Sequence, residues 1–323
     1  MIVSKRRPLG GWWGAPTVFL APAVILFLLL FAVPAISSLY VCLCKWTGFT
    51  PQMEFTGLRN FTKLLGELKV QRFEVAGASV PYVWFVGGDM RFWEAVKNNL
   101  YIMSLGGVVF FSFAFLFAAA LNHKRLRGRR FFQTMIFFPA FISVVGTATF
   151  WKLIYDSKSG LINLSLRGMG ARGFQWLDAE NAINSVIIMM VWAGVGGTMI
   201  LLLAGMRRIP KDYYEAAEID GASAPQQFFH VTVPMMREVV IIALSLWMIG
   251  SMKTFGYIQA LLAPDINDEA QVISTLQYEY AFSNRRCIFM MGRATAMAIV
   301  QVILVLTLVW FVRRFREKKS VEY

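Results

Sequence analysis

Long apolar runs constrain this chain more than any other feature of its sequence. Several runs along the 323 residues reach the length of about 18 to 20 apolar residues that a helix needs to cross a bilayer. The hydrophobic share is 57% and the charged share is 16%, which is too apolar for an ordinary soluble domain. We therefore expect an all-α membrane protein.

Six runs are predicted to be transmembrane helices. They are Thr17–Tyr40, Leu100–Leu121, Phe131–Trp151, Ala182–Met206, Val239–Leu262 and Ala294–Val312. Lys5-Arg6-Arg7 resembles the start of a signal peptide, but the run that follows is too long and lacks a small-residue cleavage site. The first run is therefore expected to be a retained helix, bent at Pro22 and Pro34.

The positions of the charges predict the topology. The formal net charge is +13, but Lys and Arg gather beside the apolar runs, and no basic patch is interleaved with exposed aromatics. This distribution argues against nucleic-acid binding and is typical of charges that fix membrane orientation. Five basic residues between 124 and 130, Arg207-Arg208 and the basic residues after Val312 all predict cytoplasmic loops. Both termini are then cytoplasmic. We expect residues 1–16 to form the cytoplasmic N-terminus and residues 17–44 the first span. Residues 45–98 are expected to form an extracytoplasmic segment, 99–315 the permease core with the remaining spans, and 316–323 the cytoplasmic tail.

The polar segment between the fourth and fifth runs has the pattern of two short helices. Pro210 suits the first turn of a helix that runs from Lys211 to Ile219. Gly221 can adopt the left-handed conformation that ends such a helix, and Ser223 can cap a second helix that runs through His230. In the first helix Ala216 and Ala217 leave a shallow face that another protein could fill.

Part of this segment carries a family signature. Its residues are Tyr214, Glu215, Ala216, Ala217, Asp220, Gly221, Ala222 and Pro234, and their spacing resembles the coupling-helix signature of ABC importer permeases of the sugar-uptake branch. Thr56-Gly57-Leu58-Arg59-Asn60-Phe61, Phe138-Pro139 and Gly160-Leu161-Ile162-Asn163 resemble other elements of the same family. The resemblance is strong over residues 90–315. An ordinary amphipathic loop helix is the alternative interpretation.

The resemblance implies a type I ABC importer permease fold, with six transmembrane helices and a cytoplasmic coupling loop over residues 207–236. It also implies four kinds of partner in a bacterial inner membrane: a second homologous permease (a heterodimer), two ATPase subunits, an extracytoplasmic solute-binding protein and the lipid bilayer. The helix 211–219 would dock on an ATPase, with Glu215 as the charged contact. ATP and Mg²⁺ would bind the ATPase subunits, and this chain would bind no cofactor itself.

Candidate solute contacts lie in the fourth and fifth runs. Trp247, Lys253, Thr254 and Tyr257 form a polar and aromatic stripe suited to a sugar, and Trp192 is a further candidate. A lysine deep in the membrane costs about 2.5–3.5 kcal/mol on insertion scales, so Lys253 is expected to face protein or a wet cavity. Snorkelling to the outer interface is the alternative. A lysine there would fit an anionic oligosaccharide.

Other chemistry is absent from the sequence. No phosphate-binding loop, HExxH motif or GxSxG motif occurs, and the six runs contain no Asp or Glu that could relay protons. Cys42, Cys44 and Cys287 lack zinc-type spacing, and Cys42 and Cys44 are interpreted as packing residues, with a pair across the outer face left open. The glycines 194, 196 and 197 are interpreted as helix-packing positions.

The sequence therefore predicts a permease for an oligosaccharide, and an anionic oligosaccharide is one candidate. The chain is expected to have no enzymatic activity of its own. Three alternatives stay open. The chain could be an ABC permease for a phosphate ester, polyamine or peptide. It could be a secondary transporter or channel. A membrane-embedded enzyme is disfavoured because no catalytic constellation is present.

Overall fold

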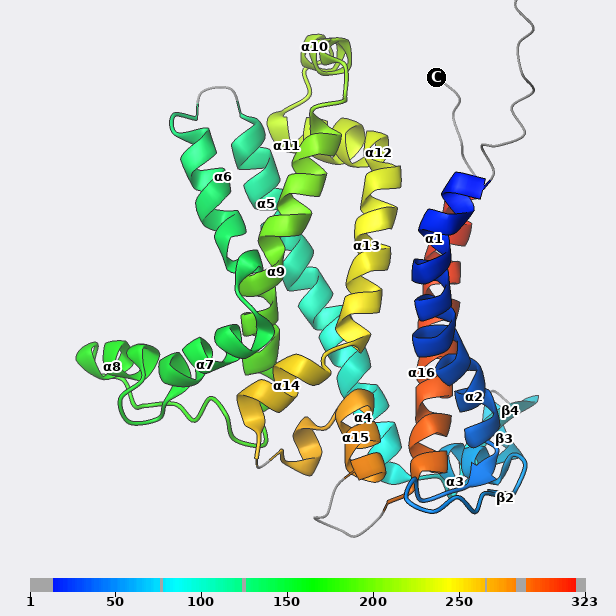
Figure 1. The fold of residues 1–323 in the computed structure, drawn as a ribbon. Coiled ribbons are helices and arrows are strands. Elements are labelled where there is room, and N and C mark those ends of the chain that lie inside the picture. The colour runs from blue at the N-terminus through cyan, green and yellow to red at the C-terminus, as the bar shows by residue number, and fades with distance from the viewer. Residues whose placement is uncertain (1–13, 76–77, 124–125, 265, 283–288, 318–323) are drawn as a thin grey trace, which may run out of the picture.

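The computed structural model describes residues 14–75, 78–123, 126–264, 266–282 and 289–317. Figure 1 shows a helical bundle with short strands at one end and the isolated helix α10 at the other. The first span begins with α1 (Gly14–Phe27), continues through the π-helical turn η1 (Leu28–Ala32) and ends with α2 (Val33–Val41). Val33 N–H reaches back to Leu28 O just before Pro34. This wider turn separates the Pro34 ring from the carbonyl one turn earlier, as a proline inside a helix requires.

The segment after the first span forms a small outer structure. A two-stranded ladder pairs β1 (Cys44–Lys45) with β2 (Glu54–Phe55), and α3 (Arg59–Leu65) follows. An antiparallel hairpin of β3 (Glu67–Val75) and β4 (Ala78–Val86) pairs Glu67 with Val86 and Val75 with Ala78. The described residues between Gly66 and Asp89 therefore form this hairpin.

The second span begins earlier than the apolar run suggests. It comprises α4 (Met90–Tyr101), the π-helical turn η2 (Ile102–Gly106) and α5 (Gly107–Asn122). The predicted start at Leu100 is wrong because the Asp89 side chain accepts the Arg91 N–H and caps the helix a full ten residues before the apolar run.

The third span is broken, and the prediction of one continuous helix over Phe131–Trp151 is wrong. Helix α6 (Arg129–Phe137) leads into the 3₁₀ turn η3 (Phe138–Phe141), and α7 (Val144–Tyr155) leaves at 102°. Pro139 lies in the tight turn, and Ser143 caps the new helix by accepting the Gly146 N–H at 3.2 Å. Helix α8 (Leu161–Gly168) then extends away from the bundle (Figure 1).

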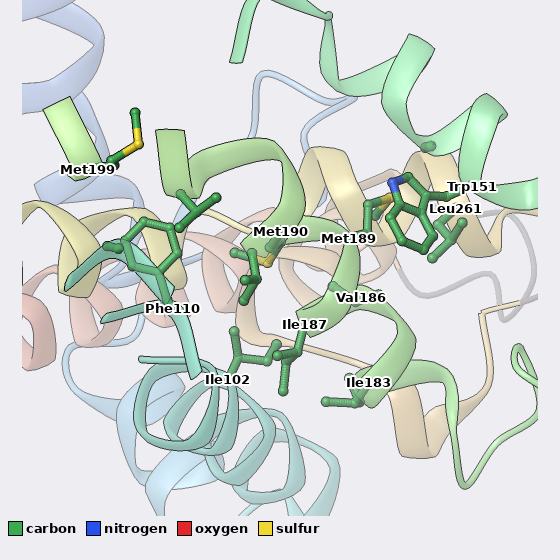
Figure 2. Close-up of a cluster of buried hydrophobic side chains, with 14 of the residues drawn as sticks. Ile102, Phe110, Trp151, Ile183, Val186, Ile187, Met189, Met190, Met199 and Leu261 are labelled. Atoms are coloured by element: carbon green, nitrogen blue, oxygen red, sulfur yellow. The ribbon is translucent and has the colours of Figure 1, made fainter. Parts of the chain in front are cut away.

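The fourth span, α9 (Ala182–Met206), has the predicted bounds and forms the centre of the core. In its most apolar stretch 61% of the residues are buried, against none in the first span. Figure 2 shows α9 side chains such as Val186 and Met189 among Ile102, Phe110 and Trp151 from other spans. The helices around α9 therefore leave their outer apolar faces for lipid or for another protein.

Glycines on α9 allow two of these contacts. A Cβ on Gly196 would collide with the Ile136 carbonyl, and one on Gly194 would lie 3.1 Å from the Phe110 ring. The packing interpretation is therefore confirmed at both positions. Gly197 differs, because a Cβ there would meet nothing within 4 Å.

The fifth span is also interrupted. Helix α13 (Arg237–Met252) ends before Lys253, and α14 (Phe255–Leu262) runs across the bundle to pack against α7 (Figure 1). The prediction of one continuous helix over Val239–Leu262 is wrong. Lys253 accordingly lies at the break and not inside a helix.

The chain finishes with η5 (Asp268–Ala270), α15 (Ile273–Phe282) and the last span, α16 (Met291–Glu317). Side chains of α3, α4, α15 and α16 form a second hydrophobic cluster around Phe92, Leu276 and Met297. Arg91 ties α4 to this outer layer through both Glu279 oxygens at 2.8 Å and through Asp268 at 3.2 Å. Burial, followed by a hydrogen bond to Asp89, raises the pKa of Tyr280 to about 12, so the phenol stays neutral and donates.

Asn60, from the motif Thr56-Gly57-Leu58-Arg59-Asn60-Phe61, holds the end of the first span in place. Asn60 donates its amide to the Cys42 and Cys44 carbonyls at 2.9 and 2.8 Å, and so closes the end of the first span. A Cβ on Gly292 would collide with the Cys44 carbonyl, so α16 begins in direct contact with this turn. Cys42 and Cys44 are buried free thiols, as the packing interpretation predicts, whereas Cys287 lies outside the described residues.

The span count agrees with the predicted class. Among the described residues, four helices are long and apolar enough to cross a membrane. Counting two bent helix pairs as one span each, Arg129–Phe141 with Val144–Tyr155 and Ala224–Met235 with Arg237–Met252, brings the total to as many as six. The protein is thus an all-α membrane protein with six candidate spans.

Candidate functional site: the loop between the fourth and fifth spans

The polar segment between α9 and α13 lies at one end of the bundle, and only its first helix stands clear of it. It contains α10 (Lys211–Ile219), α11 (Ala224–Gln227), the π-helical turn η4 (Phe228–Thr232) and α12 (Val233–Met235). Helix α10 has the predicted bounds, and Pro210 occupies the position just before its first turn. Figure 1 shows α10 at the end of the molecule opposite the strands.

The end of α10 is fixed by two backbone hydrogen bonds. Ala222 N–H donates to Ala217 O at 2.9 Å, and Gly221 N–H donates to Glu218 O at 3.0 Å. These bonds form a Schellman motif, which needs a left-handed residue, and Gly221 supplies it with φ +77°. The expected role of Gly221 in ending the helix is confirmed.

The next helix starts as the sequence predicts. Ser223 and Gln226 form a capping box, in which Ser223 N–H donates to Gln226 Oε1 at 2.7 Å. Farther along, Val233 N–H donates to Phe228 O just before the exposed Pro234, which repeats the arrangement at Pro34. The signature proline therefore accompanies a widened turn at the entry to the fifth span.

Two side-chain bonds hold α10 to the returning chain. The Tyr214 hydroxyl and Thr232 Oγ1 lie 2.9 Å apart, and Gln227 donates to Ala222 O at 3.1 Å. Thr232 is buried and belongs to the turn that precedes α13. Helix α10 is therefore bonded directly to the turn that leads into the fifth span.

The opposite face of α10 is available for contact. Glu215 and Ala216 are exposed, Ala217 is half-buried, and Asp220 is exposed at the helix end. Ile219, at the end of α10, is 87% exposed. Glu215 thus sits beside a small-residue face with an apolar side chain at its end.

The five solute-contact candidates occupy different surroundings. Trp192 is half-buried against Phe150 and Trp151, with ring centroids 5.8 Å away in each case. Trp247 lies over Gly106 and Gly107 of the second span. Its indole N–H donates to Met103 O at 2.9 Å, and its ring stacks on Phe110 with centroids 4.4 Å apart.

The remaining three candidates surround the break in the fifth span. Lys253 is exposed, Thr254 is fully buried, and Tyr257 is half-buried in α14. Thr254 Oγ1 has no hydrogen-bond partner among the described residues. The structure thus groups Lys253, Thr254 and Tyr257 at one break, while Trp192 and Trp247 pack on separate neighbouring helices.

Buried amides near this break were missed by the motif-based reasoning. Asn99 donates to Ser251 O, and Gln301 donates to Met252 O. A signal was present in the sequence, because an amide beside or within an apolar run must find a partner.

An open cavity of about 440 Å³ lies at the outer end, away from α10. Its lining includes Lys152, Tyr155, Asp156, Gln175, Trp176 and Asp178. Hydrogen bonds from the backbone and side chain of Ser159 and the backbone of Lys158 hold the pKa of Asp156 below its usual value. Lys152 Nζ donates to Ala263 O at 3.2 Å. None of the sequence-predicted site residues lines this cavity.

Comparison with known proteins identifies the family. The model of the binding-protein-dependent transport system inner membrane component matches residues 111–321, more than half of the chain. The chain belongs to this permease family. It is similar to the probable ABC transporter permease YurN of Bacillus subtilis, at 31% identity over 297 residues, covering 91% of this chain and 92% of the relative.

Two further likenesses agree with this assignment. The trehalose/maltose permease MalF of Thermococcus litoralis is 28% identical over 264 residues, covering 81% of this chain and 82% of the relative. A bacterial ABC transporter that imports the acidic polysaccharide alginate has the same fold, with a TM-score of 0.74, 24% identity and coverage of 94% and 96%. The chain is therefore a membrane-embedded permease component of the ABC importer type.

Proposed function

We propose that this permease couples ATP hydrolysis on partner subunits to solute import through α10. The observation that carries the proposal is an exposed, small-faced helix held rigidly to the start of the fifth span by the Schellman motif and the Tyr214–Thr232 bond. The chain offers no phosphate-binding loop, so the energy must come from another subunit. Two ATPase subunits and a second permease would complete the pore.

In this proposal Glu215 makes the charged contact, Ala216 and Ala217 allow close approach, and Ile219 fills an apolar pocket of the ATPase. Closure of the ATPases on ATP would push α10 and turn the spans between two packings, one open to each side. A solute-binding protein would deliver the solute at the strand-bearing end. The basic residues Arg129, Arg207 and Arg313 lie beside the helix ends nearest α10, which supports placing that end in the cytoplasm.

Glu215→Lys tests the coupling step in the complete importer reconstituted in lipid. We expect loss of uptake and of substrate-stimulated ATP hydrolysis, because the reversed charge faces the ATPase at a contact that must be desolvated. The membrane pair should still assemble, since Glu215 is exposed and supports no part of the bundle. Glu180→Lys makes the same charge change at an exposed outer position and is the control. Normal coupled hydrolysis in Glu215→Lys would exclude this role.

We further propose that the solute is an oligosaccharide. Relatives of this chain are named as permeases for trehalose or maltose, arabinooligosaccharides and diacetylchitobiose. Lys253, exposed at the break in the fifth span with Thr254 and Tyr257 beside it, supplies a cation for an acidic sugar. Trp192 and Trp247 remain candidates for stacking on sugar rings.

Lys253→Ala tests the substrate assignment. We expect the KM for acidic oligosaccharides to rise by about tenfold or more, because one exposed charge-assisted hydrogen bond is lost, with little change for neutral ones. Competition uptake with neutral and uronate-containing oligomers measures the difference. Identical kinetics for every oligomer would show that Lys253 does not contact the solute.

A further inference from the structure

The break in the fifth span has no local cause in the sequence. The nearest prolines are Pro234 and Pro264, and neither lies within the turn between α13 and α14. Gly250 and Gly256 flank the turn, but neither adopts a positive φ. Lys253 itself ends α13 with φ −99° and ψ 42°. Each glycine costs a helix only about 1 kcal/mol, so these residues weaken the helix here without ending it by themselves. The carbonyls that the break releases need hydrogen-bond partners from outside the segment.

Two side-chain amides from other spans supply that stabilisation. In an unbroken helix the Ser251 and Met252 carbonyls would accept the N–H groups of residues 255 and 256. Here Ser251 O accepts the Asn99 amide at 3.2 Å, and Met252 O accepts the Gln301 amide at 2.6 Å. The amides come from α4 in the second span and α16 in the last span, so three spans meet at this turn.

Each amide is anchored at its other end. Asn99 is fully buried, and its Oδ1 accepts the Ile273 N–H at 2.9 Å. Gln301 Oε1 accepts the Gln277 side chain at 2.8 Å. Both anchors belong to α15, so the two donors are held in place before they reach the turn. Leaving either freed carbonyl unpaired among apolar side chains would be costly.

The consequence is the placement of Lys253. Its neighbours Met252 and Thr254 are 1% and 0% exposed, whereas the Lys253 side chain is exposed. After the turn, α14 packs with Gly256 against Val144 of α7, where a Cβ would lie only 3.3 Å from the valine. A continuous helix would rotate residue 253 and remove α14 from α7. Irregular backbone at membrane depth is tolerated where it is buried in protein or lines a wet cavity, which fits a lysine presented to solute.

We propose that Asn99 and Gln301 are positioning residues that hold the fifth span open at Ser251–Thr254 and thereby present Lys253 to the solute. This inference rests on the proposed function for the last step only. The same span begins directly after the α10 loop, so motion of α10 reaches this turn along α13. The hydrogen bonds from Asn99 and Gln301 fix the end of α13 that lies farther from α10.

The test measures the turn separately from transport. In the complete complex without its native cysteines, Lys253→Cys reports the exposure of the position through its rate of reaction with a water-soluble maleimide. Gln301→Met keeps the side-chain size but removes the donor, and we expect labelling about two- to tenfold slower, the factor that one hydrogen bond supplies. Gln277→Met is the comparison, because it removes only the anchor of Gln301 and leaves the Met252 bond available, so we expect a smaller reduction.

A second variant keeps the inference testable if Gln301→Met assembles poorly. Gln301→Glu retains the acceptor for Gln277 and donates to Met252 O only when its carboxyl is protonated. The labelling rate of Gln301→Glu is divided by the rate of the chain with Gln301 at the same pH. This ratio should be low at neutral pH and rise on acidification. In chains that retain Lys253, Gln301→Met should raise KM for the acidic oligomer with kcat preserved.

The outcomes separate the two proposals. Equal labelling rates in Gln301→Met, Gln301→Glu and Gln277→Met would overturn the positioning role. Slower labelling in Gln301→Met, combined with wild-type transport by Lys253→Ala, would support the positioning role and reject Lys253 as a solute contact.

Discussion

At the scale of single residues, glycines and amides decide where helices of this permease stop. Gly221 is required for its conformation alone, because a Cβ there would touch nothing within 4 Å while its φ is +77°. Gly292 is required for space, since it lies against the Cys44 carbonyl. Asn99 and Gln301 donate to carbonyls at the end of α13, and Asn60 donates to carbonyls in the turn that follows α2. The family motif that contains Asn60 thus has a structural explanation.

Gly221→Ala should loosen the end of α10 without affecting the bundle. An L-residue in the left-handed region costs about 1–2 kcal/mol, and no steric clash adds to it. We expect faster hydrogen exchange at Ala222 and reduced coupled ATP hydrolysis in the complete importer. Gly221→Asn is the control, since Asn tolerates this conformation better and should retain more coupling. Unchanged exchange in Gly221→Ala would show that the Schellman motif does not limit this helix.

At the scale of elements, the spans contain π-helical turns, and they contact one another where a large side chain packs on glycines. The turns η1 and η4 each end two residues before a proline, whereas η2 ends at Gly106, next to Gly107. The Trp247 ring packs on these two glycines, and a Cβ on Gly107 would lie 2.8 Å from the Trp247 indole nitrogen. Trp247 therefore joins the second and fifth spans through its ring and its hydrogen bond to Met103 O, in addition to the bond from Asn99 to Ser251 O.

Trp247→Phe should destabilise this junction. The variant keeps a ring to stack on Phe110 but leaves Met103 O without the indole donor, which costs about 1 kcal/mol or more. We expect a lower midpoint of thermal unfolding in lipid nanodiscs, with KM unchanged because an aromatic face remains. Phe110→Leu, which removes the stack and leaves the N–H, provides the comparison. A wild-type midpoint in Trp247→Phe would mean that the hydrogen bond contributes nothing to the junction.

At the scale of the whole molecule, the six spans separate two chemically different ends. One end has α10, the turn between α5 and α6, the start of α1 and the end of α16 (Figure 1). The other end has the strand pairs β1–β2 and β3–β4, helix α8 and the Arg91–Glu279 ion pair. Basic residues dominate the first end, and mixed charges occupy the second. This asymmetry is what a permease with one coupling face and one delivery face needs.

A cysteine at Ser223 should react only from the cytoplasm. Ser223 is exposed beside α10, and the basic clusters at that end predict retention on the inner side. In a cysteine-free background, an impermeant thiol reagent should label Ser223→Cys in inverted vesicles and not in intact cells. Ala171→Cys, exposed in the outer loop, should show the opposite result. Labelling of Ser223→Cys from outside intact cells would invert the proposed orientation.

Local residue chemistry was sufficient to predict α9, α10, the left-handed Gly221 and the Ser223 cap, because each depends on neighbours within a few positions. Hydropathy likewise predicted six spans, since bilayer thickness sets the length of each run. The break after Phe141 had a partial local signal in Pro139 and Ser143. The early start of α4 had one in Asp89.

The break at Lys253 was decided by the tertiary structure alone. Its carbonyls are satisfied by amides that lie 152 positions away at Asn99 and 49 positions away at Gln301. No property of residues 239–262 announces those donors, and hydropathy favours one continuous helix there. By itself the sequence predicted six membrane spans and where the exposed helix α10 lies. Contacts between distant spans decided which crossings are broken, because a helix ends in a bilayer only where another part of the protein accepts its free backbone groups.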